Sequence, residues 1–225
     1  MIYIELFLVV ISGGLIAYYI RNLKKQYINF LLSFSGAYLL SIIIFHILPH
    51  IYEYPNKKII GVFILSGILF QLLLEVFSHG AEHGHEHAFG NKTPWVVLLS
   101  LSIHAFTEGL PIHAGEHINQ SYFYGILIHK LPISIILTSL MIFAGYSLRK
   151  ILLILVIFAS MTPLAAYLGE HLQLIRQYAV FINAFVAGIL THVGTTILFE
   201  NDHSHQFKIK KFTVIILAMI LAYSA

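Results

Sequence analysis

The stretch LSIHAFTEGLPIHAG, residues 101–115, carries two histidines and a glutamate inside an apolar run long enough to cross a membrane. A lone charged side chain at the centre of a bilayer costs about 2.5 to 3.5 kcal/mol or more, so Glu108 needs a partner there. The whole chain is similarly apolar, with 58% of its 225 residues hydrophobic and 10% charged, whereas a typical soluble domain has about 25% charged residues. These values predict an integral membrane protein.

Eight apolar runs are long enough to be transmembrane helices, since about 20 apolar residues cross the hydrocarbon core as a helix. The predicted fold class is therefore all-α, a bundle of eight transmembrane helices that forms a single domain over residues 1–225. The expected spans are residues 2–20, 28–50, 58–78, 94–115, 121–146, 149–169, 177–199 and 211–225, of which the last is short. The first run lacks the basic segment and cleavage site of a signal peptide, so we expect it to be retained.

Basic residues predict the orientation, because cytoplasmic loops are enriched in Lys and Arg. With the N-terminus outside, the cytoplasmic loops hold Arg21, Lys24, Lys25, Lys92, Arg149, Lys150, Lys208, Lys210 and Lys211, and the external loops hold Lys57, Lys58 and Arg176. Both termini are then external, and the histidine-rich loop at about residues 79–93 is cytoplasmic. The expected location is a bacterial inner (plasma) membrane.

Composition also narrows the chemistry. The chain has no cysteine, which excludes disulfides, thiolate metal sites and a thiol nucleophile, and it has 14 histidines. Its net charge of +3 is ordinary for a membrane protein and does not indicate nucleic acid as a partner. The expected partners are the lipid bilayer and divalent metal ions, and the sequence leaves open whether two chains form a homodimer.

The fourth and fifth spans carry a set of residues that suits a metal ion. His104 and Glu108 are four residues apart, so they lie on one face of a helix and can bind the same ion. In the fifth span His129 and Lys130 precede Pro132, which removes a backbone donor and kinks the helix. Two imidazoles and a carboxylate suit a borderline divalent cation such as Zn²⁺. We expect Lys130 to pair with Glu108 when no metal is bound.

These two spans resemble the Zrt/Irt-like (ZIP) family of divalent metal transporters. That family typically carries His-Asn-x-x-Glu/Asp-Gly in its fourth span and His-Glu-x-Pro-His-Glu, or a close variant, in its fifth. The matching residues here are His104, Glu108, Gly109, His129 and Pro132. The eight spans, the external termini and the histidine-rich loop are also similar to that family. The resemblance implies a ZIP-like architecture with a binuclear metal centre between spans four and five.

The sequence departs from the family at the second metal position. Ala105 stands in place of the Asn, Lys130 in place of the Glu and Ile133 in place of the following His or Glu, while Thr162 matches a position in span six that can hold a carboxylate. Of the family's primary metal site, His104, Glu108 and His129 are present here. Of its secondary metal site, only the bridging Glu108 is present. We infer a mononuclear site in which the Lys130 ammonium replaces the second metal.

Further histidines lie near the ends and the middle of other spans. His46 and His192 are candidates for additional ligands, although His192 could equally make a structural hydrogen bond. Candidates for an outer vestibule that concentrates cations are His50, His113, Glu116 and His117, near Glu53, Glu170 and His171. These could equally be polar helix ends that contact water and headgroups. The cytoplasmic loop histidines His79, His83, His85 and His87 predict weak binding of Zn²⁺ or Ni²⁺.

The sequence favours a transporter rather than an enzyme, one that imports zinc into the cytoplasm by alternating exposure of the site between spans four and five. Fe²⁺ and Mn²⁺ are also compatible with the ligand types. Two other classes remain open. An intramembrane zinc-dependent hydrolase would use Glu108 as a general base with His104, His129 and His192 as ligands. A haem-binding electron-transfer protein would use His104 and His117, although neither span two nor span five supplies a matching pair.

Overall fold

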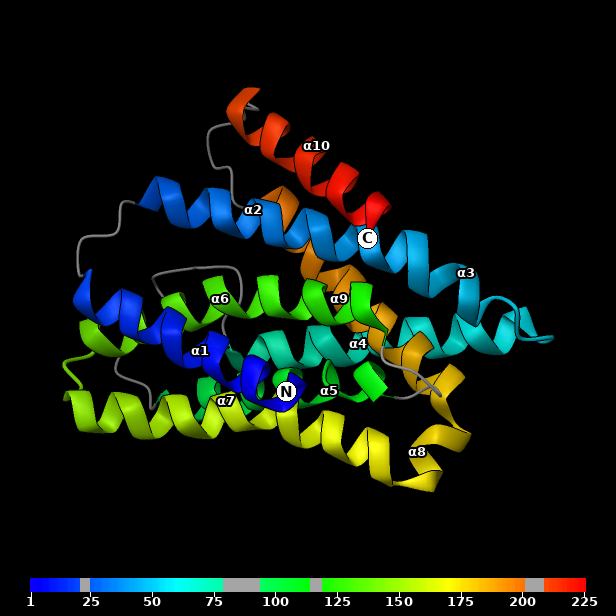
Figure 1. Ribbon diagram of the computed structural model, residues 1–225, viewed down its shortest axis with the longest axis horizontal. Helices are drawn as coiled ribbons and strands as arrows, with labels where there is room; N and C mark the ends of the chain where they lie inside the picture. The colour runs from blue at the N-terminus through cyan, green and yellow to red at the C-terminus, as the bar shows by residue number, and fades with distance from the viewer. Residues whose placement is uncertain (21–24, 79–93, 114–118, 201–208) are drawn as a thin grey trace.

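The computed structural model describes residues 1–20, 25–78, 94–113, 119–200 and 209–225, which form a bundle of long helices (Figure 1). The long helices are α1 (Ile2–Tyr19), α2 (Lys25–Ile42), α4 (Lys57–Ser78), α5 (Pro94–Thr107), α6 (Gln120–Phe143), α7 (Leu148–His171), α9 (Ala179–Glu200) and α10 (Ile209–Ser224). Short elements are the π-turn η1 (Ile43–Ile47), α3 (Leu48–Ile51), the 3₁₀ turn η4 (Leu110–His113) and α8 (Gln173–Gln177). The described residues contain no strand, as an all-α fold requires.

The helices match the eight expected spans. Within the described residues, seven helical segments are long and apolar enough to cross a membrane, and α10, with 16 residues, is the short last span. One side of α4 shows a face suited to lipid, because Val62, Leu65, Leu69 and Val76 recur at helical spacing and are 60–68% exposed. The chain is therefore an all-α integral membrane protein.

The helices pack as two groups. In the first group α1 packs on α6 and α7, and α5 packs on α7; in the second, α4 and α2 pack on α9, and α10 packs on α2. The groups meet where α2 lies along α6 and where α4 lies along α5. Figure 1 shows α2 and α10 together on one side and α7 on the opposite side, with α3 and α8 at one common end of the bundle.

Glycines allow a close backbone contact between α4 and α9. A Cβ at Gly188 would collide with the Ile64 carbonyl of α4, and a Cβ at Gly67 would collide with the Phe185 carbonyl of α9. Small residues of this kind let transmembrane helices approach backbone to backbone. The two glycines therefore allow α4 and α9 to pack closely against each other.

Two spans expected as continuous helices are interrupted next to prolines. The second span changes from α2 to the π-turn η1 just before Pro49. Proline has no N–H to donate to the Phe45 carbonyl, and its ring collides with the preceding turn of the helix. The fourth span ends as an α-helix at Thr107 and continues as η4, which contains Pro111. By contrast, α6 continues through Pro132.

Candidate metal centre

The structure brings His104, Glu108 and His129 together in the interior of the bundle. One ligand atom from each lies within 4.8 Å of the others, and the three side chains are 1%, 0% and 0% exposed. In the described part of the chain they are the only group of three or more His, Asp or Glu side chains with this geometry. Two imidazoles and one carboxylate are a ligand set that suits Zn²⁺.

The end of α5 places Glu108 beside His104. The helix ends at Thr107, and the Glu108 N–H still donates to the His104 carbonyl at 3.1 Å, so the two side chains keep their one-turn spacing. The His104 Nε2 atom is 3.5 Å from Glu108 Oε2. Both ligands from this segment therefore face the same point.

The backbone beyond Glu108 is held by a neighbouring helix. The Gly109 N–H donates to the Phe106 carbonyl and not to the Ala105 carbonyl, as it would in a regular α-helix. The Ala105 carbonyl instead accepts a hydrogen bond from the Thr162 hydroxyl of α7 at 2.8 Å. A Cβ at Gly109 would lie 2.5 Å from the Thr162 carbonyl oxygen, so this close contact requires glycine. The helix end is thus fixed against α7, as irregular backbone at membrane depth must be.

The two carboxylate oxygens of Glu108 face two different side chains. Oε1 forms an ion pair with the Lys130 ammonium, and Oε2 faces His104. Lys130 is 1% exposed, and its Nζ also lies 5.1 Å from the centre of the Phe158 ring, within range of a cation–π contact. A fully buried lysine and glutamate that pair in this way avoid the cost that either charge would incur alone.

Two further side chains, which sequence analysis did not single out, contact the imidazoles from behind. The His104 Nδ1–H donates to Gln71 Oε1 of α4 at 3.0 Å, and His129 Nδ1 lies 3.0 Å from the Ser35 hydroxyl of α2. Gln71 and Ser35 are each 0% exposed. The only signal for Gln71 in the sequence is an amide in the middle of an apolar span, four residues before Glu75.

A family model described as the ZIP zinc transporter matches residues 85–222, which is more than half of the chain and includes the whole three-residue cluster. The chain belongs to the ZIP family. It is also 28% identical over 168 residues to a protein named zinc transporter ZIP9 from Micropogonias undulatus, an alignment that covers 68% of this chain and 53% of the relative. The chain thus spans about half the length of that curated relative. Membership of a transporter family gives no support to the hydrolase and haem alternatives.

Within the ZIP family pattern, the positions expected for a second metal carry no carboxylate besides Glu108. Lys130 forms an ion pair with Glu108, and the Thr162 hydroxyl donates to the Ala105 carbonyl. Ile133 is buried in the apolar core, with 2% of its surface exposed. A cation at the Oε1 side of Glu108 would therefore meet an ammonium instead of further anionic ligands.

The other two histidines named as additional ligands have separate partners. His192 of α9 donates from Nε2 to Glu75 Oε2 of α4 at 2.7 Å, one helical turn from Gln71. His46 in the π-turn donates from Nε2 to the Ala222 carbonyl of α10 at 3.0 Å. Neither belongs to the three-residue cluster.

Of the vestibule candidates, the structure describes His50 and His113. His50 Nδ1 is 3.5 Å from Glu53 Oε2, with both side chains well exposed. His113 stacks on Tyr3 with ring centres 5.8 Å apart, and the Tyr3 hydroxyl donates to Glu170. Glu116, His117 and the loop residues His79, His83, His85 and His87 lie outside the described residues.

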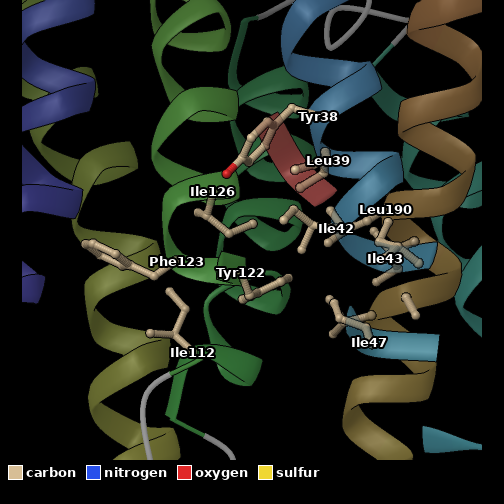
Figure 2. Packing of buried hydrophobic residues seen from close by; sticks show 14 of the residues in the cluster. Tyr38, Leu39, Ile42, Ile43, Ile47, Ile112, Tyr122, Phe123, Ile126 and Leu190 are labelled. Carbon is tan, nitrogen blue, oxygen red and sulfur yellow. The ribbon is translucent and has the colours of Figure 1, made fainter. Parts of the chain in front are cut away.

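Buried apolar side chains form a layer (Figure 2) that lies, by the order of residues along the helices, towards the α3/α8 end from the three-residue cluster. The residues labelled there are Tyr38, Leu39, Ile42, Ile43, Ile47, Ile112, Tyr122, Phe123, Ile126 and Leu190, all buried. On α6, Tyr122 and Ile126 precede His129, and Ile112 follows Glu108 towards the same end. Tyr122 also donates its hydroxyl to the Glu108 carbonyl at 2.8 Å.

Proposed function

We propose that the protein carries a divalent transition metal, zinc, across the membrane, with His104, Glu108 and His129 as the transport site. The observation that carries the proposal is the convergence of their ligand atoms within 4.8 Å at fully buried positions. Ionisable residues inside a membrane protein are costly and mark ion pathways. Membership of the ZIP family supports the same activity.

The site holds one metal ion at a time. Glu108 Oε2 faces the imidazole of His104, where the metal binds, and Oε1 is occupied by the Lys130 ammonium. The ammonium supplies one positive charge at the position where a second cation would sit. Because Lys130 also repels the bound ion, the site holds its metal more weakly than the same ligands alone, which suits a carrier that must release it.

Transport proceeds by alternating exposure of this site. From the positive-inside distribution of Lys and Arg we infer that both termini and the α3/α8 end lie outside. We infer that the apolar layer closes the site from that side, since its residues are fully or almost fully buried. Towards the other side, the Glu75–His192 pair offers a carboxylate and an imidazole that are 23% and 16% exposed. Metal would therefore leave past α4 and α9 into the cytoplasm, where the histidine-rich loop receives it.

Zinc is the preferred substrate, because two imidazoles and one carboxylate suit its borderline character, and the relative from Micropogonias undulatus is named a zinc transporter. Fe²⁺ and Mn²⁺ are also compatible with these ligands. On the external side, His50, His113 and their acidic neighbours would raise the local cation concentration.

Zinc uptake into proteoliposomes that contain a zinc-sensitive dye tests this function. We expect saturable uptake by the wild type, its loss in Glu108→Gln, and its retention in the matched control Glu5→Gln, a glutamate in the first turn of α1. If no protein takes up zinc although the wild type binds it through Glu108, the chain is a metal sensor or an intramembrane hydrolase instead.

A further inference from the structure

Both imidazoles of the metal cluster are held at their Nδ1 atoms by buried side chains of other helices. His104 Nδ1 is 3.0 Å from Gln71 Oε1, and His129 Nδ1 is 3.0 Å from the Ser35 hydroxyl. These four side chains are at most 1% exposed, so water does not replace either contact. Each imidazole therefore turns its Nε2 edge away from its anchor.

Gln71 fixes which nitrogen of His104 carries the proton. An amide oxygen only accepts hydrogen bonds, so Nδ1 must be the N–H, and the neutral ring then has its lone pair on Nε2. That lone pair lies on the side of Glu108, whose Oε2 is 3.5 Å away. An Nδ1–H held by an oxygen acceptor is the arrangement that orients histidine ligands in metal sites. The free-energy cost of selecting this tautomer is therefore incurred before a metal ion binds.

Ser35 has a different effect, because a hydroxyl can donate or accept. Ser35 therefore fixes the orientation of the His129 ring but does not determine which ring nitrogen carries the proton. The other contacts of the ring determine that. The His104 and His129 rings meet edge to face, with centres 6.1 Å apart. A rotation of either ring would carry its Nε2 away from the shared point.

The two anchors and the two ligands belong to different helix groups. Gln71 and Ser35 lie on α4 and α2, which pack with α9 and α10, whereas His104 and His129 lie on α5 and α6, which pack with α1 and α7. Both hydrogen bonds therefore cross the boundary between the groups. A displacement of one group by a few ångströms would break both contacts, since a hydrogen bond is lost beyond about 3.5 Å.

We propose that Gln71 and Ser35 are positioning residues, which preorganise His104 and His129 for metal only while the two helix groups are in the register seen here. This inference rests on the proposed function, because it assigns the control of affinity at the same site. Metal affinity is then coupled to helix position: it is high when the anchors are engaged and falls when the groups shift. The carrier gains a means of release that needs no change in the three ligands themselves.

The first test is zinc affinity, measured by calorimetry on the purified full chain. We expect Gln71→Met to weaken zinc binding by about 10- to 100-fold, the usual effect of removing an outer partner of a metal-bound histidine. Gln71→Glu keeps an acceptor oxygen and should restore binding to within a few-fold of the wild type. Ser35→Ala should weaken binding, whereas Ser41→Ala should not, because Ser41 is also a buried α2 serine but bonds to the Ala37 carbonyl of its own helix.

A second readout separates positioning from a general loss of structure. In ¹⁵N-histidine NMR spectra of the metal-free protein, His104 should show a protonated Nδ1 in the wild type and a mixture of tautomers in Gln71→Met. Zinc affinity in Gln71→Met within twofold of the wild type would overturn the inference, as would equal losses in Ser35→Ala and Ser41→Ala. If the wild type itself binds no zinc through Glu108, the proposed function fails first, so the two failures are distinguishable.

Discussion

The buried ion pair between Glu108 and Lys130 predicts a specific pattern of stabilities in a double-mutant cycle. The two side chains are 0% and 1% exposed, so removal of one partner leaves the other charged group buried without compensation. Such a change costs about 3 to 5 kcal/mol, whereas replacement of both partners of a buried pair is often close to neutral. For a chain of this length the single variants should melt about 6 to 20 °C below the wild type.

The substitutions are Glu108→Gln and Lys130→Met, which keep the side-chain volumes nearly unchanged. The double variant retains a buried amide, which costs about 1 to 3 kcal/mol, so it should be at least as stable as either single variant. The expected coupling free energy is then about 3 kcal/mol or more. Thermal unfolding in one detergent, with circular dichroism, measures all four proteins. The double variant should still fail to bind zinc, because the ligand carboxylate is absent. Additive losses of stability would refute the reasoning, because they would show that the two charges do not compensate each other.

Three further outcomes follow from contacts outside the pair. Because His46 bonds to a backbone carbonyl of α10, His46→Ala should leave zinc affinity within about twofold of the wild type, whereas His104→Ala should weaken it about 100-fold or more in calorimetry. Gly188→Val should lower the melting temperature by about 6 °C or more, because its side chain would overlap the α4 backbone, while Gly61→Val, with open space around the Cβ, should change it little. Glu75→Gln should slow zinc uptake several-fold without changing equilibrium affinity; a changed affinity with normal uptake would count against a role in release.

The helices could be predicted from the sequence because runs of about 20 apolar residues have few alternatives in a membrane. The interruptions could not be placed, although each has a local cause. Pro49 and Pro111 were visible in the sequence, but the same residue type at Pro132 leaves α6 continuous. Whether a span is interrupted depends on which neighbours satisfy the carbonyl groups that leave the helical pattern, as the Thr162 hydroxyl does for the Ala105 carbonyl.

The proximity of the candidate ligands was predictable for a different reason. His104 and Glu108 lie one turn apart on one helix, so their proximity follows from helix geometry, whereas Gln71 and Ser35 reach the site from other spans whose rotation the sequence does not specify. The same ambiguity affected His192, which lies in the middle of its span but faces Glu75. Helix rotation in a bundle depends on the packing of all neighbours, and a nearly uniform apolar pattern carries little information about it.

The most direct test of the account is the metal stoichiometry and coordination of the purified wild-type protein, measured by elemental analysis and zinc K-edge X-ray absorption. After weakly held metal has been removed by dialysis, the account predicts one zinc ion per chain, with two imidazole nitrogens at about 2.0 Å and carboxylate oxygen in the shell. Two zinc ions per chain, with a metal–metal distance of about 3.5 to 4 Å, would contradict the claim that Lys130 occupies the place of a second metal.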